Sequence, residues 1–383
     1  MTLARSLNIS KLLTKKSFFL FGPRSTGKST IIREQLGKNA FLVDLLDGQT
    51  FLRLSSDPSL LEEMSAAPLR AGKVVAIDEI QKAPMLLDQV HRLIESTNGR
   101  FLLTGSSARK LRSGAANLLA GRAWEAQLFP LTWNEIQNFE LEKYLRFGGL
   151  PHVWFSAEPD EDLSAYIHTY LKEEIQAEGL VRKLPQFARF LKVAALTNAK
   201  LINFAQIASA CEVPASTVRE YYSILSDTLV GFLVEPWRES KIRKAIQTSK
   251  FYFFDTGVTH ALCGTKTLDR NSNLWGDSFE HFIGMELRAF LSYDRIRVPL
   301  AFWRTTGGHE VDFVIDGMLA VEVKATSKVT RSDLNGLRAL QEEGKFKNLI
   351  CVSNDKIDRE MNGVQCLHWT TFLRRLWDRE FST

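Results

Sequence analysis

The sequence predicts an α/β protein with three parts: a parallel-sheet domain, a helical lid with a winged helix-turn-helix, and a second α/β domain. Short apolar runs alternate with helical stretches over residues 17–130, an order typical of a parallel sheet covered by helices. Residues 131–235 have almost entirely helical periodicity, and strand-like runs return after residue 250. The length of 383 residues exceeds that of one ordinary domain. The expected boundaries are 1–130, 131–240 and 241–383.

The strands are expected where short apolar runs are bounded by turn residues. In the first part these runs are 17–21, 40–44, 74–78 and 101–104. In the last part they are 251–254, 301–304, 311–315, 320–324 and 349–352. Residues 1–16 mix basic and apolar side chains with polar interruptions, which predicts a short amphipathic helix rather than a signal peptide.

The composition is that of a soluble globular protein. Hydrophobic residues make up 45% of the chain and charged residues 24%, which argues against a disordered or fibrous protein. The four cysteines are scattered without a CxxC pair, so neither a zinc site nor a disulfide framework is indicated. We expect reduced thiols and a cytoplasmic location. No apolar run reaches the ~18 residues of a membrane helix, so no membrane partner is expected.

A phosphate-binding loop follows the first strand. Residues 22–29 read GPRSTGKS, which matches GxxxxGK[ST] between an apolar strand and a helical run. Backbone amides at the start of such a helix face phosphate oxygens, Lys28 adds a positive charge, and the Ser29 hydroxyl can ligate Mg²⁺. An ordinary glycine-rich turn is the weaker alternative. ATP and Mg²⁺ are the expected ligands, bound by Gly22, Pro23, Arg24, Ser25, Thr26, Gly27, Lys28, Ser29 and Thr30.

Two carboxylates end the third expected strand. Asp78 is predicted to hold the magnesium ion, and Glu79 is placed to polarise an attacking water, which indicates hydrolysis rather than phosphoryl transfer to a metabolite. A solvated strand end is the alternative for this pair, and Lys28 upstream makes it less favoured. Hydroxyl residues after strand 101–104 would place Thr104 or Ser106 near the γ-phosphate, and the sequence leaves that choice open.

Three arginines follow in the sequence: Arg109, Arg112 and Arg122. One of them is a candidate arginine finger on a neighbouring subunit's nucleotide, with Arg122 the first choice, and this role requires a homo-oligomer. A surface arginine is the alternative for each of them.

The middle of the chain predicts a helical lid over residues 131–180 and a helix-turn-helix over residues 203–235. The turn is expected at residues 212–214, and residues 229–236 would supply a wing. The second helix carries one base, Arg219, beside Glu220 and Asp227, so this helix more readily contacts protein than DNA.

A basic stripe at residues 236–250 holds most of the excess charge. The whole chain carries 49 − 44 = +5, and the stripe has five bases against one acid. A nucleic-acid backbone is its candidate partner, with a solvated linker as the alternative.

A second constellation lies at residues 308–324. Asp312 is on one expected strand, and Glu322 and Lys324 lie two apart on the next, hence on one face. Two carboxylates can hold Mg²⁺ or Mn²⁺, and a neighbouring lysine can orient or deprotonate a water; this is the D…ExK pattern of PD-(D/E)xK nucleases. Glu280, on a helix over residues 275–290, is a candidate third ligand.

The register of the hairpin decides whether this second site exists. A two-residue loop would pair Asp312 with Val321 and turn Glu322 to the opposite face, whereas a three-residue loop would pair Asp312 with Glu322. A surface hairpin with charges on its wet face is the alternative to a site.

In these features the chain resembles prokaryotic AAA-type ATP-binding proteins that carry the C-terminal domain of unknown function 4143. The resemblance spans roughly residues 10–370 and implies an AAA-like ATPase, a winged-helix segment and a PD-(D/E)xK-type domain. Some members of that nuclease-like superfamily keep the fold and have lost cutting. The matching segments are residues 22–29, IDEIQ at 77–81, LTGSS at 103–107, LAGR at 119–122, LFPL at 128–131, YFFDTG at 252–257, EVD at 310–312 and EVK at 322–324.

These predictions converge on a Mg²⁺-dependent ATPase that acts on DNA through its C-terminal half, with metal-dependent cleavage at the second site as a further expectation. The alternative is a nucleotide-switched scaffold that binds a protein partner and has a catalytically silent nuclease-like domain.

Overall fold

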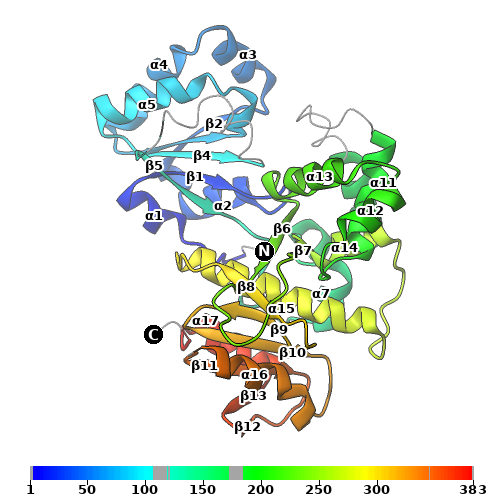
Figure 1. Cartoon of the computed structure of the whole chain (residues 1–383). Coiled ribbons are helices and arrows are strands. Elements are labelled where there is room, and N and C mark those ends of the chain that lie inside the picture. Colours follow the sequence, from blue (N-terminus) through cyan, green and yellow to red (C-terminus); the bar gives the residue numbers. More distant parts are fainter. Residues whose placement is uncertain (1–2, 107–118, 120, 172–183, 345, 382–383) are drawn as a thin grey trace.

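The N-terminal part is a five-stranded parallel sheet between two layers of helices. The computed structural model describes residues 3–106, 119, 121–171, 184–344 and 346–381. The sheet has the order β2-β3-β4-β1-β5, so the strand before the phosphate-binding loop lies between β4 and β5 (Figure 1). Its strands are β1 (Ser17–Phe21), β2 (Ala40–Asp44), β3 (Val74–Asp78), β4 (Phe101–Gly105) and β5 (Ala123–Gln127).

Alternate side chains of these strands fill two cores. Phe19 and Ile77 pack with the helices on one face, whereas Phe18 and Leu102 pack with those on the other. Burial on both faces explains why β1, β3 and β4 read as continuous apolar runs. The covering helices are α1 (Ile9–Lys15), α2 (Lys28–Gln35), α3 (Gly48–Ser56), α4 (Leu60–Arg70) and α5 (Leu86–Thr97), with 3-10 turns at Gly37–Asn39 and Ile80–Lys82.

The middle part is helical, as predicted. The turn between α12 and α13 begins at Glu212, whose φ of 54° is left-handed, and so the predicted turn position is confirmed. The helices are α7 (Leu141–Phe147), α8 (Pro151–Trp154), α9 (Pro159–Ala165), α11 (Leu184–Leu196), α12 (Phe204–Cys211), α13 (Ala215–Asp227) and α14 (Thr256–Cys263), with a 3-10 turn at Trp133–Glu135 and a π-helical turn at Tyr166–Leu171.

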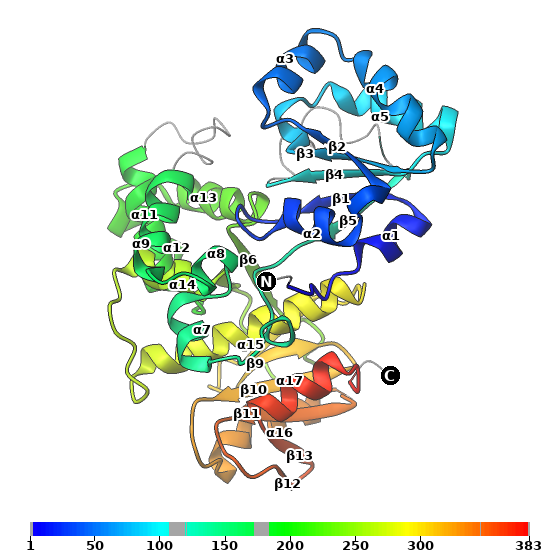
Figure 2. The same ribbon diagram turned by 180° about the vertical axis from the view of Figure 1, so that it is seen from behind.

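The C-terminal part is an eight-stranded mixed sheet with the order β12-β13-β11-β10-β9-β8-β6-β7. Helices α15 and α17 cover one face and α16 the other, which Figures 1 and 2 show from opposite sides. The strands are β6 (Gly231–Pro236), β7 (Lys250–Phe253), β8 (Leu300–Arg304), β9 (Glu310–Ile315), β10 (Leu319–Lys324), β11 (Asn348–Ser353), β12 (Arg359–Met361) and β13 (Val364–His368). The helices are α15 (Asn273–Tyr293), α16 (Asn335–Glu343) and α17 (Trp369–Trp377), with a 3-10 turn at Arg331–Leu334.

The strand expected as a free wing belongs to this large sheet. β6 pairs with β7 in antiparallel fashion, as a wing would, and it also pairs with β8 in parallel at Glu235 and Pro236. The segment therefore joins the helix-turn-helix to the C-terminal sheet instead of projecting into solvent.

Across the residues that the structure describes, no helix is both long and apolar enough to cross a membrane. Helix α15, with 21 residues, carries Asp277, Glu280, Glu286 and Arg288.

Candidate functional site

The phosphate-binding loop is closed around its own lysine. Lys28 Nζ donates to the carbonyl oxygens of Gly22 at 2.8 Å and Pro23 at 3.1 Å, and its side chain is buried. Gly27 has a left-handed φ of 93° immediately before α2. A Cβ at Gly22 would lie 2.5 Å from the Leu128 carbonyl oxygen, so the loop requires glycine there. Within the predicted nucleotide segment, Gly22, Pro23, Thr26 and Lys28 are buried, Ser25, Gly27 and Ser29 are half-buried, and Arg24 and Thr30 are exposed.

The predicted magnesium ligands are adjacent. Ser29 Oγ donates to Asp78 Oδ2 at 2.5 Å, which joins the start of α2 to the end of β3. The Thr104 hydroxyl donates to the other oxygen of Asp78 and accepts from the Glu79 amide at 3.2 Å. A hydroxyl and a carboxylate side by side at a helix N-terminus fit the oxygen ligands that Mg²⁺ prefers beside phosphates.

Glu79 is held by a residue that sequence reasoning missed. Its backbone φ of 58° is left-handed, and its carboxylate accepts a hydrogen bond from Gln81 Nε2. The same Gln81 nitrogen donates to Ser106 Oγ at 3.2 Å. The two sensor candidates are thereby distinguished by position, because Thr104 contacts Asp78 whereas Ser106 contacts the glutamine beside Glu79. The signal for Gln81 was its place two residues after Glu79 in IDEIQ.

Arg5 was also missed by the sequence analysis. It lies outside the GxxxxGK[ST] motif and contacts the phosphate-binding loop at Thr26. Its guanidinium donates to the Thr26 carbonyl at 2.7 Å, the Phe129 carbonyl at 2.6 Å and Glu135 Oε2 at 3.0 Å. Burial acts to lower the pKa of Arg5, but the attractions and hydrogen bonds of Glu135 and Tyr293 together outweigh it, so the pKa is raised. Nothing in the sequence pairs residues 130 positions apart, so this contact could not be predicted.

The arginine-finger candidates have different outcomes. Arg109 and Arg112 lie outside the described residues. Arg122 Nε donates to Glu95 Oε1 on α5 at 2.8 Å, and this hydrogen bond with the arginine lowers the pKa of Glu95. A finger role for Arg122 therefore requires this ion pair to open.

The register of the C-terminal hairpin is the one that creates a site. Leu319 pairs with Ile315, Ala320 with Val314 and Val321 with Phe313, so the loop has three residues, 316–318, and Asp312 faces Glu322. Of the two registers that the sequence left open, the structure has the one with a three-residue loop.

Asp312 and Glu322 share a buried space. Asp312 Oδ2 accepts from the Val323 amide at 2.8 Å, and Glu322 Oε1 accepts from Lys324 Nζ at 2.5 Å. Glu322 Oε2 is buried without a hydrogen-bond partner among the described residues. Burial and repulsion from Glu322 raise the pKa of Asp312 well above its usual range; burial raises the pKa of Glu322 to about 7 against the attraction of Lys324. Both shifts reflect several carboxyl groups crowded into one buried space.

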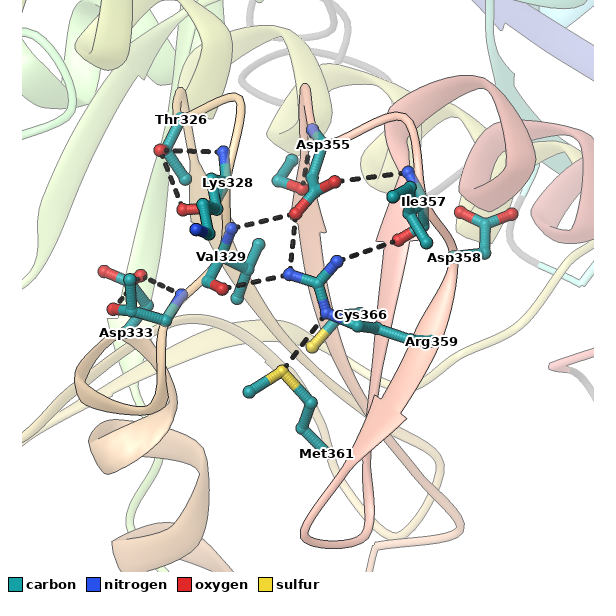
Figure 3. A network of polar contacts seen from close by, with 12 residues as sticks. Thr326, Lys328, Val329, Asp333, Asp355, Ile357, Asp358, Arg359, Met361 and Cys366 are labelled. Atoms are coloured by element: carbon teal, nitrogen blue, oxygen red, sulfur yellow. Dashed lines mark hydrogen bonds and ion pairs between the residues drawn. The ribbon is translucent and has the colours of Figure 1, made fainter.

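The loop after β10 is anchored by a polar network (Figure 3). Asp355 accepts from the Val329 amide at 3.0 Å and from Arg359 Nη2 at 2.7 Å, and Arg359 Nη2 also donates to the Val329 carbonyl at 3.0 Å. These contacts fix the chain at Val329, five residues after Lys324.

Lys250 enters the acidic space from β7. Its Nζ lies 2.9 Å from Glu310 Oε1, 3.1 Å from Glu280 Oε1 and 3.8 Å from Asp312 Oδ1, and its side chain is 4% exposed. Burial acts to lower the pKa of Lys250, and these carboxylates raise it well above its usual value, so the ammonium stays charged. The Tyr252 hydroxyl adds a 2.5 Å hydrogen bond to Glu280.

This arrangement does not fit a divalent ion. In the described parts of the chain, no group of three or more His, Cys, Asp or Glu side chains is arranged to hold a metal. Glu280, the candidate third ligand, faces Lys250 and Tyr252 instead. Sequence reasoning assigned Lys250 to the basic stripe and missed its place among the acids.

The basic stripe at residues 236–250 presents less exposed positive charge than its composition indicated. Arg243 is paired with Glu342 and Glu343, the latter through Nη1 at 3.2 Å, and Lys250 is buried. The exposed bases of the stripe are Arg238, Lys241 and Lys244. In the helix-turn-helix, the Arg219 guanidinium lies over the Phe204 ring at 3.9 Å.

Comparison with known proteins gives the family. Residues 14–137 match the model of an AAA domain, residues 138–269 that of domain of unknown function 8612, and residues 275–372 that of domain of unknown function 4143. An uncharacterized protein of Mycobacterium tuberculosis is 30% identical over 338 residues, which cover 84% of this chain and 74% of the relative. The chain belongs to this family of AAA-domain proteins with a C-terminal domain of unknown function 4143.

A second relative is likewise an uncharacterized protein. It is from Methanocaldococcus jannaschii and is 24% identical over 341 residues, which cover 80% of this chain and 74% of the relative. Among solved structures, the ORC1 protein of Aeropyrum pernix in complex with DNA gives a TM-score of 0.26 at 11% identity, over 65% of this chain and 86% of that one. This structural similarity is too low to support an argument about function.

Proposed function

We propose that the N-terminal domain binds ATP with Mg²⁺ and hydrolyses it. The observation that carries the proposal is the adjacency of Ser29 and Asp78, whose oxygens are 2.5 Å apart at the start of the helix that follows the phosphate-binding loop. When bound, Mg²⁺ would neutralise charge on the β- and γ-phosphates. Ser29 and Asp78 would hold it, and Lys28 would exchange its two loop carbonyls for phosphate oxygens.

Glu79 is proposed as the residue that orients the attacking water. Its carboxylate must first release Gln81, because an oxygen engaged with an amide donor is a poorer acceptor for a water proton. Thr104, hydrogen-bonded to Asp78, is the proposed sensor of the γ-phosphate, and Ser106 would act through Gln81.

The test separates binding from turnover. Lys28→Ala should abolish ATP binding in a fluorescent-nucleotide titration, whereas Glu79→Gln should bind ATP normally and release phosphate at least a hundredfold more slowly. Lys38→Ala, at an exposed lysine ten positions later, is the matched control and should behave as the unmodified protein. Normal phosphate release by Glu79→Gln would refute the base assignment.

An arginine finger would make the active form a homo-oligomer. Arg122→Ala should then lower turnover without weakening ATP binding. Arg92→Ala is the matched control, since Arg92 forms a comparable exposed ion pair with Glu62 at 2.6 Å. Equal turnover in both variants would remove Arg122 from the mechanism.

DNA is the proposed partner of the C-terminal half. Three exposed bases of the stripe, Arg238, Lys241 and Lys244, support this, and their contacts would be to phosphates. The triple glutamine variant should weaken duplex binding and flatten its salt dependence, whereas a triple variant of the exposed Lys11, Lys15 and Lys38 should not. Binding that ignores salt would favour the alternative, a nucleotide-switched scaffold for a protein partner.

Cleavage of phosphodiester bonds at Asp312, Glu322 and Lys324 is a second candidate. The register that brings Asp312 opposite Glu322 favours it. The position of Lys250 counts against it, because cleavage of this kind needs a divalent ion. Metal-dependent nicking should vanish in Asp312→Asn and in Lys324→Ala and persist in Lys28→Ala. Equal nicking by the unmodified protein and Asp312→Asn would point to a contaminant.

A further inference from the structure

The C-terminal acidic site contains the ammonium group of Lys250. Its carboxylates come from α15 (Glu280), β9 (Glu310 and Asp312) and β10 (Glu322), and the Lys250 ammonium from β7 contacts three of the four. The lysine side chain is 4% exposed. A buried ammonium without a partner would be strongly unfavourable, so these carboxylates are what allows Lys250 to be buried in its charged form.

The ammonium and a divalent ion need the same oxygens. A lysine Nζ has three N–H donors, and here it lies 2.9 Å, 3.1 Å and 3.8 Å from three carboxylate oxygens. Mg²⁺ and Mn²⁺ coordinate carboxylate oxygens at shorter distances, about 2.0–2.2 Å, and would lie inside the same group of acids. Two cations cannot share that space, because their mutual repulsion in a buried site is large.

We propose that the Lys250 ammonium occupies the divalent-cation position of this acidic site, so that a metal ion and the lysine side chain compete for it. The proposal rests on the geometry around Lys250 and does not depend on ATP hydrolysis. It makes the site catalytically silent while the lysine is in place.

Two further contacts hold the lysine there. The Tyr252 hydroxyl, two residues along β7, hydrogen-bonds to Glu280 and turns that carboxylate toward Lys250. The Phe302 ring lies 5.4 Å from Lys250 Nζ, within the range of a cation–π contact. Glu322 Oε2 is buried and has no hydrogen-bond partner among the described residues.

Lys250→Met tests the competition, since methionine keeps much of the side-chain volume and removes the charge. Mn²⁺ alone, without nucleotide, is the probe, and free Mn²⁺ is followed by electron paramagnetic resonance. We expect Lys250→Met to gain one Mn²⁺ site at least tenfold tighter than any Asp312-dependent site in the unmodified protein. Asp312→Asn in the Lys250→Met background should abolish the gain. Lys200→Met is the matched control, because Lys200 forms a surface ion pair with Asp277 at 3.3 Å, and it should gain nothing.

The proposal is overturned if Lys250→Met binds Mn²⁺ no more tightly than the unmodified protein, or if the gain survives Asp312→Asn. Loss of folding is also informative. If Lys250→Met unfolds in metal-free buffer, millimolar Mn²⁺ should restore its thermal transition, since the ion would replace the missing charge. Failure of Mn²⁺ to restore that transition would count against the competition as firmly as an unchanged affinity.

Discussion

Removing the Arg5 guanidinium should destabilise the AAA domain far more than removing an arginine from an exposed ion pair. Arg5 and Glu135 form an ion pair with side chains 4% and 0% exposed, and Arg5 also donates to the carbonyls of Thr26 and Phe129. Breaking a buried pair from one side costs about 3–5 kcal/mol, because the remaining charge stays buried without a partner. At about 2–4 °C per kcal/mol, Arg5→Met should lower the first unfolding transition by about 6–20 °C.

The control for this prediction has the same chemistry and different burial. Arg92 and Glu62 are 2.6 Å apart with side chains 56% and 54% exposed, so Arg92→Met should cost at most about 1 kcal/mol. Differential scanning calorimetry of both variants gives the comparison. Because Arg5 holds the Thr26 carbonyl, Arg5→Met should also weaken ATP binding, whereas Arg5→Lys should recover part of it. Equal transitions for Arg5→Met and Arg92→Met would refute the reasoning.

Two further predictions concern buried groups away from the sites. Burial raises the pKa of Glu286 to about 8 from a usual value near 4.5. The folded protein therefore binds the proton more tightly, and its stability should fall as pH rises through that window, most steeply by about 1.4 kcal/mol per pH unit. Glu286→Gln should flatten this decline in melting temperatures measured from pH 5 to 9. A Cβ at Gly148 would lie 2.0 Å from Asp255 Oδ1 at a φ of 74°, so Gly148→Ala should cost about 2–4 kcal/mol in a urea titration. Gly264→Ala, at a φ of 71° with open space around it, should cost about 1 kcal/mol, and equal losses would contradict the clash.

The bounds of β1, β2 and β3 coincide with the expected apolar runs. β1 and β3 are almost wholly buried, which leaves a continuous apolar signal, whereas β2 has one buried residue and was predicted from its apolar composition. β5, at Ala123–Gln127, was missed because its sequence AWEAQ mixes glutamate and glutamine with apolar residues. The strand β12 was missed because it has three residues, REM, of which two are charged.

The candidate site residues that could be predicted are those that lie in local sequence motifs. The phosphate-binding loop and its Asp78 partner lie in local motifs whose spacing carries their chemistry, and the structure brings them within hydrogen-bond distance. Arg5 and Lys250 act through contacts with residues far along the chain, at 130 positions for Glu135 and 60 or more for Glu310 and Asp312. Such contacts depend on how whole elements pack, and the local sequence contains no signal for them.

The pairing of β6 with β8 has a consequence for how this family can be dissected. The boundary between the two matched regions of unknown function falls at residues 269–275, whereas β6 and β7 precede it and complete the sheet that follows it. A fragment that starts at the second region would have a β8 edge exposed to other chains and would lack the Lys250 ammonium beside its carboxylates. Any activity measured in it, including metal-dependent cleavage, would therefore not represent the intact chain. A fragment that keeps β6 paired with β8 and Lys250 beside the carboxylates must begin before Gly231.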